Sequence, residues 1–498
     1  MSQVGERAPA GGLAPALGSP AGSVGSESGS GLGSAQGSAP AAGSGSASAL
    51  DLGSARRARA RLGSPPAALV RVLGLAALAA SVGASVWIAV GASDGRVLVQ
   101  LPHPGRAPAW IDGPLRPLAS LVGSLPLSSV SISLSALALA YLVALACSRS
   151  IQLRHALVAV VLANVAFTLC PTLVSTDVFG YIAYAREAAL HGLNPYVASP
   201  SAVPHDSIYP FVYWKHAPTP YGPLFTGLSV PLGLLSKTAA LWTYKALTGA
   251  ASIAIAFMVA RIARARGLDP TRAAILVGLN PILLFYAVSG AHNDLLGLAL
   301  IVCALWLAID GRSAAGAGVA VTAAAVKVTL GLALPFLLIG ARRRGRAVAG
   351  AAVAIVVLGL PTLLLYGTHI FGQVHKITTD PVYDISYSGP AELARALGSR
   401  ITTPVRDVST GLAALCALAA LVWAWRGKDW VTAAGWAFLA LIASIASLAP
   451  WYLVWVLPFA ALSRSRALTV VALAATGYLV VVHMPALGYV PWLSGAGS

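Results

Sequence analysis

The chain has 498 residues, of which 57% are hydrophobic and only 10% are charged, and its formal net charge is +17 at pH 7. Soluble globular proteins contain about 25% charged residues, so this composition excludes an ordinary soluble domain. The basic residues lie in short segments between apolar runs, as they do in membrane proteins, and no basic and aromatic domain is present to bind nucleic acid. We therefore predict that the lipid bilayer surrounds the protein and that nucleic acid is not a partner.

The N-terminal 60 residues are rich in Gly, Ala and Ser and lack the apolar core of a signal peptide. Such a segment cannot bury enough apolar surface to fold. We predict a disordered tail over 1–60 and an integral membrane domain over 61–498. Arginines 56, 57, 59, 61 and 71 lie beside the start of the first apolar run, so we expect the tail to be cytoplasmic.

Apolar runs of helical length fill most of the remaining chain. About 20 apolar residues in a helix cross a hydrocarbon core of about 30 Å. We predict thirteen spans, at 68–90, 128–147, 155–174, 241–260, 273–289, 294–309, 314–326, 328–340, 347–366, 408–425, 430–448, 451–462 and 467–484. The predicted fold class is an all-α polytopic membrane protein, a bundle of about 13 transmembrane helices.

The lengths and charges of the loops predict their sides. One set of loops is only a few residues long and carries arginine clusters, such as 261–272 and 342–346. The opposite loops, at 91–127, 175–240 and 367–407, are much longer and less basic. Because basic loops stay in the cytoplasm, the long loops and the active site are predicted on the outer face. An additional span at 222–236 would reverse this pattern, so we interpret that segment as an interfacial or re-entrant helix.

Acidic residues are scarce, and the first informative one is Asp177, directly after the third predicted span. A carboxylate that emerges from the membrane is partly desolvated, which suits a general base. In a helix over 177–191, Asp177, Tyr181 and Tyr184 share one face and would form an acidic and aromatic wall for a sugar. The alternative is that Thr176 or Asp177 simply caps that helix.

Two further tyrosines lie in turn sequences of the same long loop. Tyr196 follows a Gly-Leu-Asn-Pro turn, and Tyr221 precedes Gly222 and Pro223, which suit the start of another helix. Both rings are candidates for stacking on a sugar. The alternative role for both is as aromatic residues of the membrane interface.

A polar triplet, His292, Asn293 and Asp294, interrupts two apolar runs. Polar groups at membrane depth are functional candidates, so we predict that the triplet binds a charged or hydroxyl-rich ligand, with a hairpin cap as the alternative. One His beside one Asp leaves a divalent metal open, but no further ligands follow at a readable spacing. Lys327 is a candidate for holding a phosphate at the membrane surface or for snorkelling, and Lys245 is expected to snorkel.

These residues occur in segments that resemble the GT-C fold of lipid-phosphosugar-dependent glycosyltransferases. More narrowly, the chain is similar to the actinobacterial polyprenol-phosphomannose-dependent α-1,6-mannosyltransferases. The segments that carry the resemblance follow in the family's order and are Thr176–Tyr181, Gly192–Tyr196, Tyr221–Phe225, His292–Asp294, Ala325–Lys327 and Pro450–Leu453.

The resemblance implies an inverting glycosyltransferase of the bacterial inner membrane with a periplasmic active site. Asp177 would act as base on a hydroxyl of a glycan or glycolipid acceptor. The donor would be a hexose, mannose in this family, on polyprenyl phosphate. Alternatives from other classes are a transporter or flippase for a lipid-linked sugar and a non-enzymatic scaffold. A transporter would show internal repeats and ionisable groups near the midplane, whereas no repeat is found and the acidic residues gather on one face.

Overall fold

The computed structural model describes residues 66–95, 108–123, 125–372 and 387–485. By its internal contacts the chain divides into two units, Met1–Ser64 and Pro65–Ser498, and the described residues all belong to the second. The tail predicted over 1–60 therefore lies outside the described residues, and its disorder stays a prediction.

The described residues form helices and turns and contain no strand, which confirms the all-α fold class. The α-helices are α2 (Ala67–Gly91), α3 (Ala109–Asp112), α4 (Leu127–Ala146), α5 (Leu153–Leu169), α6 (Asp177–His191), α7 (Pro223–Gly233), α8 (Lys237–Ala265), α9 (Pro270–Gly278), α10 (Asp294–Ile309), α11 (Ser313–Val326), α12 (Ala333–Gly340), α13 (Arg344–Tyr366), α15 (Gly389–Ala396), α16 (Thr403–Trp425), α17 (Trp430–Ser444), α18 (Leu457–Leu462) and α19 (Arg466–Val482). Short 3-10 segments are η1 (Ala92–Asp94), η2 (Arg116–Leu121), η3 (Ser148–Ser150), η4 (Pro200–Ala202), η5 (Tyr209–Phe211), η7 (Val328–Leu332), η8 (Gly367–Phe371) and η9 (Pro450–Trp455), and η6 (Ile282–Val288) is a π-helix.

Five helices are long and apolar enough to cross a membrane: α2, α4, α8, α13 and α16, with α2 and α13 extended by the 3-10 turns that follow them. The pair α9 and η6 is bent by 44° and adds a sixth if it counts as one span. Seven further apolar helices have 10–17 residues. The helices agree with a polytopic membrane protein, but the predicted number of thirteen spans is not confirmed.

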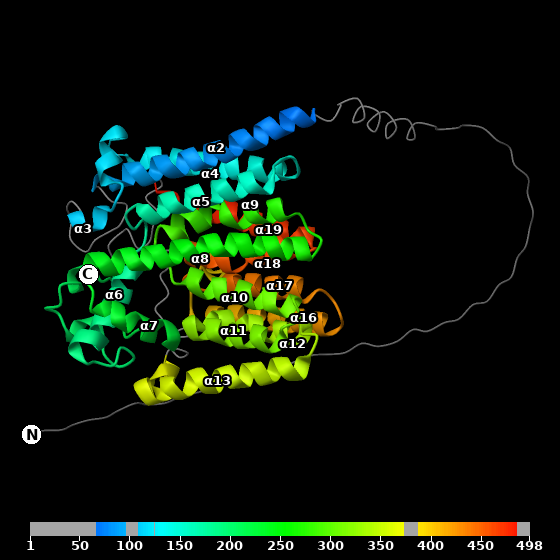
Figure 1. Ribbon diagram of the computed structural model, residues 1–498. Coiled ribbons are helices and arrows are strands. Elements are labelled where there is room, and N and C mark those ends of the chain that lie inside the picture. The colour runs from blue at the N-terminus through cyan, green and yellow to red at the C-terminus, as the bar shows by residue number, and fades with distance from the viewer. Residues whose placement is uncertain (1–65, 96–107, 124, 373–386, 486–498) are drawn as a thin grey trace, which may run out of the picture. The chain divides into compact units, whose positions relative to one another are not determined.

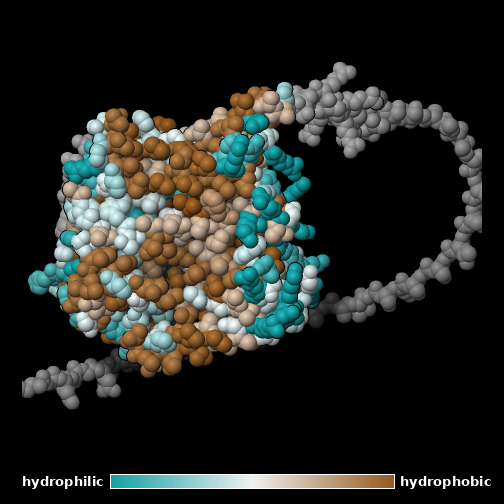
Figure 2. All heavy atoms as spheres, viewed as in Figure 1, coloured by the Kyte–Doolittle hydropathy of each residue, from teal (hydrophilic) through white to brown (hydrophobic). Residues whose placement is uncertain are grey.

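The long helices lie side by side in a stack, with α2 and α4 at one edge and α13 at the other (Figure 1). Successive neighbours in contact include α5 with α8, α8 with α10, α10 with α11, and α11 with α13. α3, α6 and α7 gather at one end of the stack, whereas α8 ends and α13 begins at the opposite end. A hydrophobic band separates the two ends on the face shown in Figure 2, and strongly hydrophilic residues gather where α13 begins.

The segment predicted to be interfacial or re-entrant forms α7, which has 11 residues. A helix of that length spans only about 16 Å, well short of a hydrocarbon core. α7 packs closely on α6. The approach requires glycine at position 233, because a side chain there would clash with the backbone carbonyl of Ala185. The segment is therefore too short to be an independent span, as predicted, and its position relative to a membrane stays a prediction.

The span predicted at 273–289 is not one straight helix. α9 ends at Gly278 and the chain continues as the π-helix η6 from Ile282. Pro281 lacks a backbone N–H, and the side chain of Asn280 accepts a hydrogen bond from the backbone N–H of Ile282, which breaks the regular ladder. The bend directs the end of η6 toward the segment that contains His292. Irregular helices of this kind are frequent at functional sites.

The expectation that Lys245 snorkels is wrong. Its side chain is fully buried in α8 and bonds to backbone carbonyls at the ends of α5 and η6. The sequence of α8 alone could not show that two helix ends meet there.

Candidate active site

Asp177 is the first residue of α6 and follows a loop from α5. Its carboxylate is 21% exposed, and its backbone N–H donates to Ser175 Oγ at 3.2 Å. Thr176 occupies the N-cap position but makes no side-chain cap hydrogen bond. The capping alternative therefore gains no support from the N-cap residue. The carboxylate lies at the N-terminal end of α6.

His292 lies beside Asp177 and is completely buried. Its Nδ1 is 3.4 Å from Asp177 Oδ2, and its ring stacks on Trp451 with centroids 3.8 Å apart and an interplanar angle of 20°. On another side the ring approaches Gly290, where an added Cβ would lie 2.6 Å from His292 Nε2. The imidazole is thus held by glycine and by indole at a fixed distance from the carboxylate.

The three residues of the polar triplet share an unusual property. Both ring nitrogens of His292, Nδ2 of Asn293 and Oδ2 of Asp294 are buried and have no hydrogen-bond partner among the described residues. Leaving a buried polar atom unpaired costs about 1–3 kcal/mol, so such atoms are rare outside functional sites. These atoms have hydrogen-bonding capacity that the described residues do not use, and binding of a ligand by the triplet stays a prediction.

Asp294 Oδ1 lies at the centre of a second cluster. It accepts from Lys327 Nζ at 2.7 Å and from Trp455 Nε1 at 2.7 Å. The Lys327 ammonium also lies over the rings of Tyr452, at 4.9 Å, and Trp455, at 5.2 Å. The side chain of Lys327 is 17% exposed. Lys327 is therefore fixed in position by a carboxylate and two aromatic rings and does not extend freely to the surface.

The two rings of the predicted acidic and aromatic wall, Tyr181 and Tyr184, are both buried. Tyr181 and Tyr184 both contact Tyr221 edge-on, with centroids 4.8 and 6.2 Å apart. Tyr184 donates to the carbonyl of Ala217 at 2.9 Å, and the Tyr181 hydroxyl lies 3.3 Å from the backbone N of Asn293. These two tyrosines pack against Tyr221 and bond to the backbone, and direct contact of either with a sugar stays a prediction.

Tyr221 is only partly buried, and the charge of Asp177 acts on its phenol. Burial, and after it the charge of Asp177, raise the pKa of the Tyr221 phenol well above its ordinary value, so the hydroxyl stays neutral and can donate. Tyr196 is buried, and its hydroxyl donates to the Tyr221 carbonyl at 2.9 Å. Of the four predicted tyrosines, Tyr221 is the one that is not fully buried, and its contact with a ligand stays a prediction.

The turn that carries Tyr221 is attached to the segment that carries Lys327. The backbone N–H of Gly222 donates to the carbonyl of Val326 at 3.1 Å. A Cβ at position 222 would collide with the backbone carbonyls of Ala325 and Val326, so only glycine permits this approach. The Tyr-Gly-Pro and Ala-Val-Lys sequences, about 100 residues apart, therefore meet at one place.

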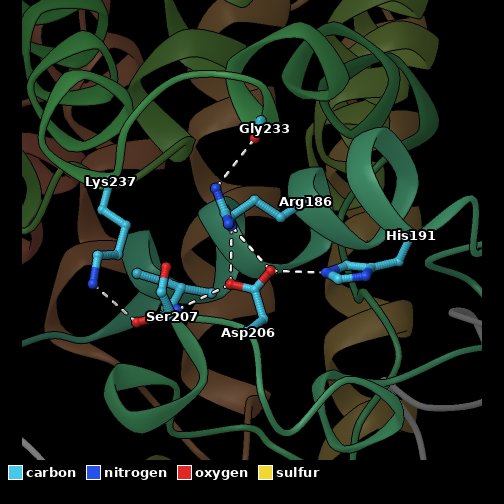
Figure 3. Close-up of polar contacts among 7 residues, drawn as sticks. Arg186, His191, Asp206, Ser207, Gly233 and Lys237 are labelled. Atoms are coloured by element: carbon cyan, nitrogen blue, oxygen red, sulfur yellow. Dashed lines mark hydrogen bonds and ion pairs between the residues drawn. The ribbon is translucent and has the colours of Figure 1, made fainter.

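The long loop between α6 and α7 is fastened to α6 by Asp206 (Figure 3). Asp206 accepts from Arg186 Nε at 2.9 Å and lies 2.8 Å from His191 Nε2. Burial raises the pKa of Asp206, but the hydrogen bonds from Arg186 and His191 outweigh burial and leave the pKa below its ordinary value. Lys237, the first residue of α8, adds a bond to the carbonyl of Ser207. This cluster holds the loop in place, and no catalytic role is assigned to it.

The structure adds residues that the candidate set lacks. Segment η9 supplies Trp451 to His292, Tyr452 to Lys327, and Trp455 to both Asp294 and Lys327. Tyr452 and Trp455 also stack on each other at 4.7 Å. Pro450 and two tryptophans so close together were a usable signal, but aromatic residues in apolar runs are usually core or interface residues.

No group of three or more His, Cys, Asp or Glu side chains in the described part of the chain is arranged to hold a metal ion. The pairing of Asp177 with His292 supplies two such groups, and Asp294 is already bonded to Lys327 and Trp455. The described site brings together a carboxylate, an imidazole and an ammonium.

Comparison with known proteins gives the family. A model of the family described as alpha-(1->6)-mannopyranosyltransferase, N-terminal domain, matches residues 71–343, which include all nine candidate residues. The alpha-(1->6)-mannopyranosyltransferase A of Mycobacterium tuberculosis is 27% identical over 372 residues, which cover 65% of this chain and 70% of that protein.

Two other relatives align over shorter stretches. A probable alpha-(1->6)-mannopyranosyltransferase of Mycolicibacterium smegmatis is 31% identical over 34% of this chain and 30% of its own length. The alpha-(1->6)-mannopyranosyltransferase A of Corynebacterium glutamicum is 27% identical over 33% of this chain and 34% of its own length. No solved structure matches. Because the family model covers more than half of the chain, the protein belongs to the alpha-(1->6)-mannopyranosyltransferase family and is a glycosyltransferase.

Proposed function

We propose that this protein transfers a mannosyl residue from a polyprenyl phosphate to a glycan or glycolipid acceptor at the outer face of the bacterial inner membrane. The observation that carries the proposal is the partly exposed Asp177 carboxylate, held 3.4 Å from the buried His292 imidazole. The names of the relatives support mannose and an α-1,6 linkage. The transporter alternative gives way because these relatives are named as transferases.

In the proposed reaction Asp177 removes the proton from an acceptor hydroxyl. The hydroxyl oxygen attacks the anomeric carbon, and the bond from that carbon to the phosphate oxygen breaks with its electron pair. Polyprenyl phosphate leaves with the negative charge. Displacement from the opposite side inverts the anomeric centre, so a β-linked donor gives an α-mannoside. Positioning of the two reactants supplies much of the rate of such a step.

The remaining groups have supporting roles in this proposal. The Lys327 ammonium has three N–H groups, and Asp294 accepts from one of them, so others are left to meet the leaving phosphate. The Tyr221 hydroxyl stays neutral and can donate to a sugar oxygen. His292 fixes the orientation of the Asp177 carboxylate through their 3.4 Å contact, and long contacts of this kind often tighten into hydrogen bonds when substrate binds.

The proposed side of the membrane rests on the two ends of the molecule. The helix ends where arginines cluster lie opposite α6 and α7, which border the Asp177 site (Figures 1 and 2). Basic ends face the cytoplasm, so the site would face outward. In that orientation a lipid-linked sugar reaches the site from the outer leaflet.

The test uses purified protein, radiolabelled polyprenyl phosphomannose and an α-mannoside acceptor. We expect Asp177→Asn to lower kcat by about 10²–10⁴-fold, as loss of a general base does, while the protein keeps its thermal stability. Asp310→Asn is the matched control, because Asp310 is an exposed carboxylate paired with Arg312 outside the site. Full transfer activity in Asp177→Asn would exclude Asp177 as the base. Absence of transfer by the wild type with every polyprenyl phosphosugar would refute the donor.

A further inference from the structure

Lys245 is a buried lysine for which the proposed chemistry has no use. It lies in α8 and is 0% exposed. Its ammonium donates to the backbone carbonyls of Ser289 at 2.8 Å, Phe167 at 3.2 Å and Pro171 at 3.5 Å. Among the described residues it forms no ion pair with a carboxylate. Burying a charge costs several kcal/mol unless it is compensated, so a lysine without a role would be expensive here.

The three carbonyl groups belong to the ends of two helices. Phe167 lies in the last turn of α5, and Pro171 lies two residues beyond the end of that helix. Ser289 directly follows the π-helix η6. Carbonyls at the ends of helices lack partners within the helix and carry partial negative charge, so they are suitable acceptors for an ammonium. Lys245 therefore joins the end of α5 to the end of η6.

Each of these helix ends leads directly into one half of the candidate site. From Pro171 the chain runs six residues to Asp177, and from Ser289 it runs three residues to His292. The ammonium therefore contacts the first part of both connecting segments. The Lys245 side chain thus bonds to both connecting segments.

Both connecting segments contain a strained residue. Val174 has φ of 55° and Ala291 has φ of 54°, and these are the two non-glycine residues with left-handed φ in the described chain. Such conformations cost about 1–3 kcal/mol each and persist only when the surroundings hold them. Strained segments would relax if their ends were free. Lys245 holds one end of each.

We infer that Lys245 is a positioning residue that sets the separation of Asp177 and His292 by bonding the two strained segments that carry them. The ammonium does not touch the reacting atoms. It acts through the carbonyls of Pro171 and Ser289, and its loss lets both segments relax, so the carboxylate and the imidazole move apart. The inference deepens the proposed function and rests on it.

The first test compares kcat and KM of Lys245→Met with those of the wild type. A misplacement of about 1 Å can cost about 10²-fold in rate, so we expect kcat to fall by about that factor while KM for the donor changes little. Lys245→Gln keeps two N–H donors and should recover part of the loss. Lys237→Met is the matched control, because Lys237 begins the same helix, is partly exposed and donates to one loop carbonyl. Wild-type kcat in Lys245→Met would overturn the inference, as would a Lys245→Gln variant no better than Lys245→Met at equal thermal stability.

The second test asks whether Lys245 acts through His292. In the His292→Gln variant the pair that Lys245 positions is already lost. The double variant should therefore be about as active as the poorer single variant, whereas independent effects multiply. Multiplying losses would show a purely structural lysine and overturn the inference. If Lys245→Met does not fold, Lys245→Gln enters the same cycle.

The two proposals fail in different ways. Full activity of Asp177→Asn removes the base assignment, whatever the Lys245 variants do. An inactive Asp177→Asn together with a fully active Lys245→Met removes only the positioning role.

Discussion

The imidazole of His292 occupies a slot that is formed by Trp451 and Gly290. Trp451 lies against one face of the ring, and the missing side chain of Gly290 leaves room beside Nε2. A stacked arrangement with a tryptophan fixes the plane of the ring, and the backbone at Ala291 fixes its direction. No hydrogen bond from the described residues holds the ring. Rotation of the ring by even a small angle would therefore be free to move Nδ1 away from Asp177.

Replacing Gly290 by alanine tests this slot. The new methyl group would lie 2.6 Å from His292 Nε2 and 2.7 Å from the Tyr286 carbonyl, so the ring has to shift. We expect kcat for mannosyl transfer to fall by about 10²-fold. Gly83→Ala is the control, because a Cβ at Gly83 in α2 meets nothing within 4 Å. Unchanged kcat in Gly290→Ala would mean that the position of His292 does not matter to the reaction.

At the residue scale the sequence pointed to polar residues and to four tyrosines, but the candidate set did not include Trp455. Asp177, His292 and Lys327 stand out because charged and polar residues are scarce in an apolar chain. Trp455 does not stand out, since a tryptophan in an apolar run is usually a core residue. Its role depends on Asp294, 161 residues away in the chain, and spacing along one segment cannot reveal that contact.

At the scale of elements, α6 carries two acidic residues with opposite environments. Asp177 at its start is partly exposed, whereas Glu187 in its third turn is fully buried, and neither oxygen of Glu187 has a hydrogen-bond partner among the described residues. Burial, and after it the charge of Asp206, raise the pKa of Glu187 from 4.5 to about 8. The folded chain therefore holds a proton on Glu187 at neutral pH.

This proton makes stability depend on pH in a defined direction. Between pH 4.5 and about 8 the folded chain binds a proton that the unfolded chain has released, so the free energy of unfolding falls as pH rises through this range. Glu187→Gln removes this contribution. We expect the variant to match the wild type in thermal stability at about pH 5 and to exceed it at about pH 8.5, where the wild type has to bury a charge. Equal unfolding temperatures of the two proteins at the higher pH would contradict a protonated Glu187.

The helices themselves were predictable because each apolar run reads as a helix, and most ends lie within a few residues of the predicted ones. Some predicted spans are broken, and α9 with η6 is one of them. Whether the Asn280–Pro281 sequence bends a span or ends it depends on partners of Asn280 elsewhere in the chain. The Asn280 amide donates to Tyr141 and Thr476, which are 139 and 196 residues away. The sequence around Asn280 cannot predict such long-range contacts.

At the scale of the whole molecule, the two ends of the helix stack differ in charge and in content. Arginine-rich turns lie at the end where α8 ends and α13 begins, and α6 and α7 lie at the other end (Figure 1). α13 with η8, and α16, are almost wholly exposed, with 6% and 11% of an apolar stretch of 18 residues buried, which suits contact with lipid. The orientation of this stack decides which compartment the site faces.

Cysteine labelling in intact cells tests the orientation. In a background without the four native cysteines, we expect a membrane-impermeant maleimide to label His205→Cys from outside and Arg264→Cys only after permeabilisation. Both positions are exposed, His205 in the loop after α6 and Arg264 at the end of α8. Labelling of position 264 from outside would reverse the proposed orientation, and with it the side on which transfer takes place.

Lys245 also bears on how the chain enters the membrane during synthesis. A lysine in a membrane-spanning helix raises the free energy of insertion by about 2.5–3.5 kcal/mol when it stands alone. Two of its carbonyl acceptors, in α5 and just after it, are made before α8, but Ser289 follows Lys245 by 44 residues. α8 therefore cannot complete its hydrogen bonds until η6 has left the ribosome. We therefore expect α5, α8 and η6 to insert cooperatively, and we expect a nascent chain that stops soon after α8 to hold that helix in the bilayer only weakly.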